Sequence, residues 1–265
     1  DVSDDDDVSD DDDVSDDDDT GDDDTGDDDD TGDDDDSGGD DDDSAAPVSC
    51  VGDYTVDGID TAGDLAQIVD CSSISGTLTI QETALTTLSP LASLTSVGGS
   101  LVVNNNTSMT SLGDFSGLLS VGGDLSIWGN AALADLDGFS SLVSVGGQVT
   151  IQVNTVLSDV LGLSSLASIG AQLSIQLNPG LGNLDGLASL SSVGGNLYIR
   201  FNDFLTDVDG LVSLTTVAGD LYIRDNEALC QDSVDAFLGA CTSCGSAVEV
   251  SGNDGACPGD SGGGD

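Results

Sequence analysis

An internal repeat constrains the fold of this chain more than any other feature. Aligned on Gly-Gly pairs, the 265-residue sequence contains seven units with the pattern x-L-x-I-x-x-N-x-x-L-x-x-L-x-G-L-x-S-L-x-S-V-G-G. The first unit is 23 residues long and the next five are 24 residues each. One unit cannot bury its own apolar face but stacked units can, so the repeat predicts a solenoid. The units start at Thr77, Ser100, Asp124, Gln148, Gln172, Asn196 and Asp220.

The spacing of side chains within each unit predicts its local structure. Apolar residues at positions 2 and 4 alternate with polar ones, which is typical of a β-strand, and stacked strands would form a parallel sheet. Apolar residues at positions 10, 13, 16, 19 and 22 are expected to fill the core, and Gly at 23 and 24 to permit a close turn. Asn at position 7 is expected to hydrogen-bond the backbone of neighbouring coils. The units carry it as Asn106, Asn130, Asn154, Asn178, Asn202 and Asn226.

Two short helices are predicted to cap the ends of the repeat array. Thr61-Ala-Gly-Asp64 has the pattern of a capping box that opens a helix through Val69, and a second helix is expected from Asp232 to Ala240.

All six cysteines lie outside the repeats, which favours disulfides at the two ends and an oxidising compartment. Cys50 and Cys71 bracket the first helix and are expected to pair. The other four allow three pairings. One pair among them, in Cys241-Thr-Ser-Cys244, also has the spacing of a zinc or redox motif, but no second such motif and no His accompanies it. The four are Cys230, Cys241, Cys244 and Cys257.

Charge excludes several classes of function. The net charge is −50, and 28 of the 52 acidic residues lie in residues 1–43. Nucleic acid and bare anionic membranes would be repelled by such a surface. The chain has neither His nor Lys, so it lacks the commonest general base, the Schiff-base amine and the usual zinc ligand. We therefore predict a protein that is not an enzyme and that has no catalytic residues, cofactor or metal site.

The composition divides the chain into three parts. Residues 1–46 are predicted to be a disordered Asp-rich tether, residues 47–257 a β-solenoid with two caps, and residues 258–265 a loose linker. The acidic blocks lack the spacing of an ordered calcium loop, so weak and diffuse Ca²⁺ association is expected there. No apolar run is long enough to span a bilayer. Because the chain begins with Asp1, a signal peptide is expected to have preceded it.

The run Cys71-Ser-Ser-Ile-Ser-Gly-Thr-Leu-Thr-Ile80, followed by G-x-L-x-I-x-x-N units, resembles the receptor L-domain family of leucine-rich repeats. The resemblance covers roughly residues 50–244. It implies a right-handed parallel β-solenoid of 24-residue repeats, short helical caps closed by disulfides, and an extracellular setting. The acidic segment is similar to the spacers of some bacterial surface lipoproteins. That similarity implies a lipid anchor upstream of residue 1 and display at the cell surface, as on an outer-membrane lipoprotein.

The outward face of the strands, formed by positions 3 and 5, is the candidate binding surface. Most of its residues are small and polar, whereas its C-terminal end combines both bases of the chain with two of its three Tyr. Tyr, Trp and Arg are enriched at binding hot spots. The candidate ligand-binding residues are Trp128, Tyr198, Arg200, Tyr222 and Arg224. An exposed apolar stripe is also expected at position 6, formed by Val153, Leu177 and Phe201.

A simpler explanation for the Tyr and Arg pairs is duplication of one Y-I-R triplet, with the Arg residues offsetting acids such as Asp203 and Asp225.

The functional prediction is a secreted, non-catalytic binding or adhesion module that recognises an extracellular protein or glycan. The alternative is a structural solenoid of the cell envelope without a specific ligand. Concentration-dependent oligomers with no ligand would favour that alternative.

Overall fold

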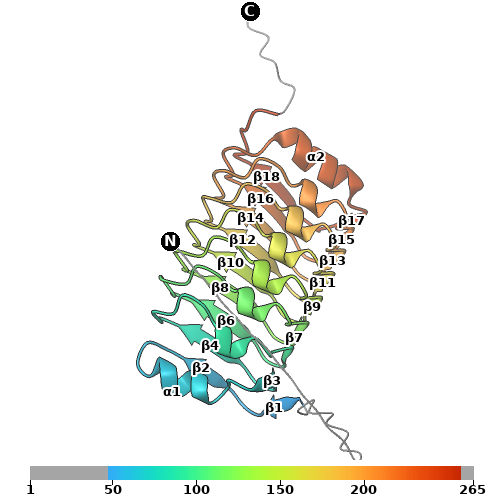
Figure 1. Cartoon of the computed structure of the whole chain (residues 1–265). Helices are drawn as coiled ribbons and strands as arrows, with labels where there is room; N and C mark the ends of the chain where they lie inside the picture. The colour runs from blue at the N-terminus through green and yellow to red at the C-terminus, as the bar shows by residue number, and fades with distance from the viewer. Residues whose placement is uncertain (1–46, 258–265) are drawn as a thin grey trace, which may run out of the picture. The chain divides into compact units, whose positions relative to one another are not determined.

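The computed structural model describes residues 47–257, which consist mainly of short strands in successive coils (Figure 1). The predicted tether, residues 1–46, and the predicted linker, residues 258–265, lie outside the described residues. Each coil of the repeat array contributes a four-residue strand, a 3₁₀-helical turn and a two-residue strand. No helix in the part that the structure describes is long and apolar enough to cross a bilayer.

The strands form two parallel sheets of nine strands each. The prediction of a parallel sheet and of a β-solenoid-like repeat is therefore confirmed. The second sheet was not predicted. The main sheet contains β2 (Tyr54–Val56), β4 (Leu78–Gln81), β6 (Leu101–Asn104), β8 (Leu125–Trp128), β10 (Val149–Gln152), β12 (Leu173–Gln176), β14 (Leu197–Arg200), β16 (Leu221–Arg224) and β18 (Val248–Ser251).

In the repeats, the second sheet uses the two residues before the glycine-containing turn, which are Ser-Val in most units. Short 3₁₀ helices on the third side of the coils stack on one another. The second sheet contains β1 (Val48–Cys50), β3 (Cys71–Ile74), β5 (Ser96–Val97), β7 (Ser120–Val121), β9 (Ser144–Val145), β11 (Ser168–Ile169), β13 (Ser192–Val193), β15 (Thr216–Val217) and β17 (Ser243–Cys244). The 3₁₀ helices are η1 (Ser89–Leu91), η2 (Gly113–Phe115), η3 (Asp137–Phe139), η4 (Leu161–Leu163), η5 (Asp185–Leu187) and η6 (Asp209–Leu211).

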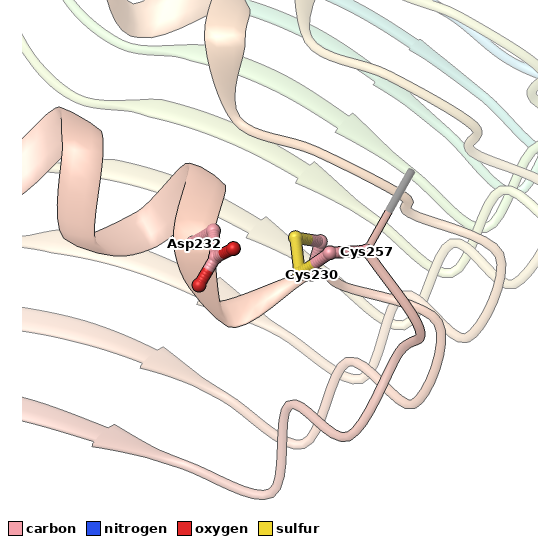
Figure 2. A group of neighbouring side chains, drawn as sticks. All are labelled: Cys230, Asp232 and Cys257. Carbon is pink, nitrogen blue, oxygen red and sulfur yellow. A yellow bond between two sulfur atoms is a disulfide. The ribbon is translucent and has the colours of Figure 1, made fainter. Parts of the chain in front are cut away.

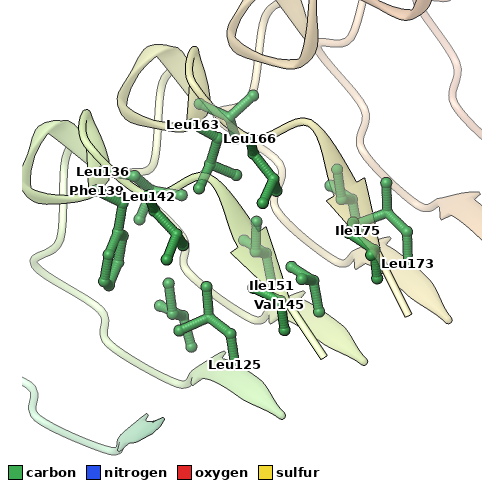
Figure 3. Close-up of a cluster of buried hydrophobic side chains, with 14 of the residues drawn as sticks. Leu125, Leu136, Phe139, Leu142, Val145, Ile151, Leu163, Leu166, Leu173 and Ile175 are labelled. Carbon is green, nitrogen blue, oxygen red and sulfur yellow. The ribbon is translucent and has the colours of Figure 1, made fainter. Parts of the chain in front are cut away.

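The core runs through the coils between the two sheets and the 3₁₀ helices (Figure 3). The apolar positions expected to fill it are buried in the five 24-residue coils, as for Leu136, Phe139 and Leu142, which are 0 % exposed, whereas Leu85 of the first coil is partly buried. Phe139 stacks on Phe115 of the preceding coil, with ring centroids 5.6 Å apart. Because each coil buries its apolar side chains against its neighbours, the coils depend on one another for stability.

The predicted Asn row is confirmed as a buried ladder. Asn178 is 0 % exposed; its amide nitrogen Nδ2 donates to the Ile151 carbonyl at 2.9 Å, and its Oδ1 accepts from the backbone N–H of Asn154 at 3.0 Å. The same pair of bonds recurs from coil to coil. Backbone groups that would be buried without partners at this corner are thereby satisfied.

Glycine at position 15 of the repeat has a steric reason. A Cβ atom added to Gly162 in η4 would overlap the backbone carbonyl of Leu136 in the preceding coil, and the same overlap recurs at Gly138, Gly186 and Gly210. The backbones of these coils therefore approach too closely for a side chain, whereas η2 has Asp114 and η1 has Pro90 at this position.

The N-terminal cap contains helix α1 (Thr61–Ala66), which differs from the prediction at both ends. The N-cap is Asp60, whose carboxylate accepts from the Gly63 N–H, rather than Thr61. The Thr61 hydroxyl donates instead to the backbone carbonyl of Asp57. The helix ends at Ala66, short of the expected Val69, because the next N–H groups, of Gln67 and Ile68, bond to carbonyls three residues back and form turns.

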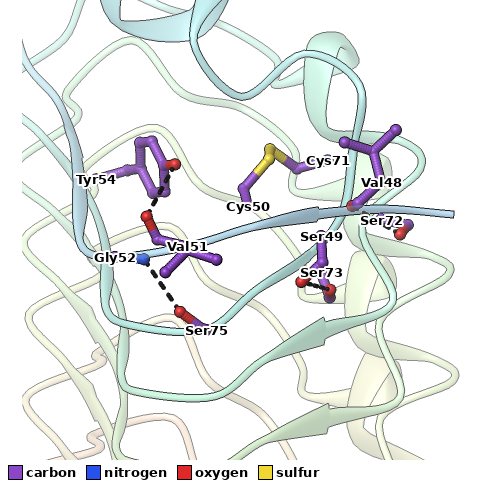
Figure 4. Close-up of a disulfide and its surroundings, with 10 residues drawn as sticks. All are labelled: Val48, Ser49, Cys50, Val51, Gly52, Tyr54, Cys71, Ser72, Ser73 and Ser75. Carbon is purple, nitrogen blue, oxygen red and sulfur yellow. Dashed lines mark hydrogen bonds between the residues drawn. A yellow bond between two sulfur atoms is a disulfide. The ribbon is translucent and has the colours of Figure 1, made fainter.

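A disulfide joins Cys50 of β1 to Cys71 of β3, as expected (Figure 4). Hydrogen bonds beside it tie the same segments together: the Ser73 hydroxyl lies 3.1 Å from that of Ser49, and the Gly52 N–H donates to the Ser75 hydroxyl at 3.0 Å. The first strand of the second sheet, β1, is thus held to its neighbour β3 by a disulfide and by hydrogen bonds beside it.

The C-terminal cap contains α2 (Gln231–Ala240), one residue longer than predicted, and two strands that were not predicted. One of these, β18, pairs with β16 and extends the main sheet by one coil. Asn253 extends the Asn ladder, because its Nδ2 donates to the Ile223 carbonyl at 2.8 Å. Two disulfides resolve the open pairing: Cys230–Cys257 and Cys241–Cys244.

Candidate binding surface

The register of the main sheet brings four of the five candidate residues together. Tyr198 pairs with Tyr222, and Arg200 pairs with Arg224, on the adjacent strands β14 and β16. Side chains at alternate strand positions share a face, so all four project from the outer side of the sheet. We call these four residues the strand-face patch.

The two Tyr rings of the strand-face patch stack face to face, with centroids 4.8 Å apart and 7° between the ring planes. The guanidinium of Arg200 lies over the Tyr198 ring at 4.8 Å from the centroid, and that of Arg224 lies 6.0 Å from the Tyr222 centroid. Cation–π contact of this kind favours ordered Arg side chains. The patch is therefore a preorganised aromatic and cationic surface.

Arg200 has no carboxylate within 4.0 Å among the described residues. Its Nε and Nη2 atoms donate to Oε1 of Gln176, at 3.1 and 2.7 Å. A neutral amide orients the guanidinium but leaves its charge uncompensated. The prediction that the Arg residues only offset nearby acids therefore does not describe Arg200.

Arg224, unlike Arg200, lies beside carboxylates that compensate its charge. Its Nη1 lies 2.6 Å from Oε1 of Glu249, and its Nε lies 3.8 Å from Oδ2 of Asp225. Asp225 was an expected partner, whereas Glu249 was not, because residues 248–251 were not predicted to form a strand beside β16. The alternation Val248-Glu-Val250 followed by Asn253 repeats the strand and Asn positions, and it is the signal that could have identified this coil.

The environment of the Tyr222 hydroxyl is negative. The nearby carboxylate of Asp220 raises the pKa of Tyr222 above its ordinary value of 10.0, with smaller contributions from burial, Tyr198 and Glu249. The Tyr198 hydroxyl accepts a hydrogen bond from Nδ2 of Asn196 at 2.8 Å. Both hydroxyls are thus positioned by side chains at the start of their own strands, Asn196 for Tyr198 and Asp220 for Tyr222.

Trp128 lies on the same outer face of the main sheet as the strand-face patch, but it is separated from the patch. It is 39 % exposed on β8, and strands β10 and β12 lie between it and β14. Three strand spacings amount to about 14 Å. Ser174, which was expected to face solvent between them, is fully buried, because the Gln152 and Gln176 amides both donate to its hydroxyl.

Position 6 of each unit lies at the corner directly after the main strand and adopts a left-handed backbone. Val153, Leu177 and Phe201 each have φ of 57°. Non-glycine residues enter this region at a cost of about 1–2 kcal/mol, and β-branched residues rarely do so. The remaining units place Glu82, Asn105, Gly129 and Asp225 here, and of these Asn, Gly and Asp are residue types that tolerate this backbone. The apolar stripe at position 6 was predicted, whereas its left-handed backbone was not.

Further apolar residues lie on the same corner. Val156 is 50 % exposed and Phe204 is 68 % exposed, each three residues after a left-handed position. We call Val153, Val156, Leu177, Phe201 and Phe204 the corner ridge. It adjoins the strand-face patch, since Phe201 directly follows Arg200.

A shallow groove of about 480 Å³ follows the second sheet. Its lining repeats Ser, a β-branched residue and Gly, as in Ser144, Val145 and Gly146. The groove presents hydroxyls and backbone without a charged side chain, so it offers little chemistry for selective recognition.

One cluster in the C-terminal cap has the residue types of a metal site. Cys230, Asp232 and Cys257 place their ligand atoms within 4.8 Å of one another. Figure 2 shows that the two sulfurs are bonded to each other. Thiolates, not disulfide sulfurs, bind metals. The cluster is thus a structural disulfide beside the carboxylate of Asp232. Cys241 and Cys244, which have the spacing of a zinc or redox motif, are likewise bonded to each other.

Comparison with protein-family models, with curated proteins and with solved structures gave no match.

Proposed function

We propose that this chain is an extracellular, non-catalytic binding or adhesion module of the cell surface that recognises a glycan or protein through its outer strand face. The strand-face patch carries this proposal. It gathers both Arg residues of the chain and two of its three Tyr on neighbouring strands, in an ordered arrangement. These Tyr and Arg side chains are half-buried and held in place before binding, so they lose little conformational entropy when a partner docks.

The proposed architecture is a right-handed solenoid of 24-residue leucine-rich repeats related to the receptor L-domain. Support comes from the run Cys71–Ile80, from the G-x-L-x-I-x-x-N units and from the disulfide in each cap. The disulfides also support location outside the cytosol, because they persist in oxidising compartments. A lipid anchor upstream of residue 1 remains part of the proposal on the strength of the Asp-rich segment.

The test compares two double variants against glycan and extracellular-protein arrays. Arg200→Ala with Tyr222→Ala removes one cation and the ring stack. Thr79→Ala with Gln81→Ala is the control, because it also alters positions 3 and 5 of the repeat, here on the single strand β4 towards the other end of the sheet. We expect the first variant to lose at least about tenfold in affinity for any ligand found, and the control to bind normally. Unchanged binding by the first variant, at full stability, would remove the patch from the proposal.

The structural alternative rests on the rest of the outer face, which is small and polar over much of its length. It predicts concentration-dependent oligomers in light scattering and no ligand on either array. A monomer that binds an array component contradicts it.

A further inference from the structure

We propose that the corner ridge and Arg200 together form a docking surface for a protein segment that presents apolar side chains next to a carboxylate. This inference rests on the proposed binding function and specifies the class of its partner.

Hydrogen bonds show that the ridge is a continuous feature across coils. The backbone N–H of Val153 donates to the Gln176 carbonyl at 3.3 Å, and that of Leu177 donates to the Arg200 carbonyl at 3.1 Å. Phe201 makes the same kind of bond to the Asp225 carbonyl at 3.1 Å. Their side chains are therefore arranged along the solenoid at the strand spacing of about 4.8 Å.

The apolar residues at position 6 carry two independent costs in free energy, one from backbone conformation and one from exposure to water. The left-handed backbone disfavours Val, Leu and Phe, while Leu177 and Phe201 are 48 % and 42 % exposed to solvent. Asn105 and Gly129 show that the fold accepts residues without either cost at the same place in the coil. Backbone strain retained where it exposes apolar groups indicates a use for those groups in binding.

Charge defines the second half of the surface. Arg200 directly precedes Phe201 and has no carboxylate within 4.0 Å among the described residues, although the chain carries 52 acidic residues. Its guanidinium is oriented by Gln176, so it is ready to pair with an incoming carboxylate. The partner must therefore place an acidic group beside its apolar side chains.

These features distinguish the proposed partner from the other candidates. A second copy of the chain would bring together two molecules of net charge −50, which repel each other. A glycan needs hydrogen-bonding groups around a ring platform, and the side chains of the corner ridge contain no polar atom. Apolar side chains from a protein match the ridge, and one carboxylate matches Arg200.

Three variants of the full chain test the proposal. Leu177→Asn with Phe201→Asn removes the apolar groups and installs a residue suited to the left-handed backbone, so thermal stability should stay the same or rise. Leu119→Asn is the control, because Leu119 is similarly exposed, at 51 %, but precedes β7 of the second sheet. Arg200→Gln removes only the charge and copies the neighbouring glutamines.

The probes are a displayed library of random linear peptides and a glycan array, both screened with the wild-type chain. We expect selected peptides to combine apolar residues with Asp or Glu, and to bind Leu177→Asn/Phe201→Asn at least about tenfold more weakly while Leu119→Asn binds normally. Arg200→Gln should weaken acidic peptides but not their Asn or Gln analogues, which a double-mutant cycle measures.

Failure of this inference is separable from failure of the proposed function. Glycan binding that is insensitive to Leu177→Asn/Phe201→Asn, with no peptide selected, would overturn the inference but retain a binding module. A lowered melting temperature for that variant would also overturn it, because the side chains would then be structural. Absence of any ligand in both screens would overturn both.

Discussion

Tyr222 stacks on Tyr198 at 4.8 Å, and the carboxylate of Asp220 on the same strand raises the pKa of the Tyr222 phenol. The neutral phenol is therefore favoured in the folded state. Its contribution to stability is fully present below pH 10.0 and is lost as the pH rises through the higher folded pKa. We expect the phenolate absorbance of Tyr222, taken as wild type minus Tyr222→Phe, to titrate above pH 10.0.

Salt provides the control for that titration. Molar NaCl screens the Asp220 charge and should move the Tyr222 midpoint down towards its ordinary value. A midpoint at the ordinary value in low salt would contradict the arrangement of these two side chains.

Replacing Asn178 with Ala should strongly destabilise the protein. The variant leaves the Asn154 N–H without a partner inside the core, and it removes the bond from the Asn178 amide to the Ile151 carbonyl, which still accepts within the sheet. One buried unsatisfied donor and one lost hydrogen bond cost about 2–4 kcal/mol in the free energy of unfolding. Urea denaturation measures this loss. Asn183→Ala is the control: Asn183 accepts a single exposed hydrogen bond, from the Asp185 N–H. A change of similar size in both variants would contradict the ladder as a source of stability.

Two glycine substitutions should have opposite effects. Gly162→Ala forces a Cβ against the Leu136 carbonyl and should cost about 1–3 kcal/mol of stability. Gly239→Ala, in α2, meets nothing within 4 Å and should stabilise the protein by about 0.5–1 kcal/mol. Melting temperatures of the two variants test this, and a neutral Gly162→Ala would show that adjacent coils are less closely packed than the structure indicates.

Removing the N-terminal disulfide should cost more than removing the shortest one. Cys50 and Cys71 are 21 residues apart, whereas Cys241 and Cys244 are three apart. Chain-entropy arguments give about 3 kcal/mol for the first and about 2 kcal/mol for the second. Paired Cys→Ser variants, compared by urea unfolding, check the order. The reverse order would mean that local packing, not loop length, controls the contribution of these caps.

Local pattern was sufficient to predict much of the solenoid. Alternation at Leu197 and Ile199 predicted an inward-facing strand, and the repeat offset predicted that Tyr198 and Tyr222 would be neighbours; both predictions are confirmed. These features depend on periodicity, which a sequence displays directly. The N-cap at Asp60 was missed because two adjacent residues could each have capped the helix.

Register and backbone conformation were harder to predict than periodicity. Glu249 pairs with Arg224 only because β18 lies beside β16. The two residues are 25 positions apart, so their pairing does not follow the 24-residue offset of the other coils. Val153 has a left-handed backbone against its intrinsic preference, because the hydrogen bond to the Gln176 carbonyl and the buried Asn154 next to it hold the corner in place.

The sequence by itself determined that the chain forms stacked strand–turn coils, that Asn lines one corner, and that cysteines close both ends. Those properties follow from spacing within one unit. Only the tertiary structure decided which charges are compensated, since Arg200 meets Gln176 and Arg224 meets Glu249. It also decided that Trp128 stands apart from the strand-face patch. Such outcomes depend on which coils are adjacent in space, and no single unit contains that information.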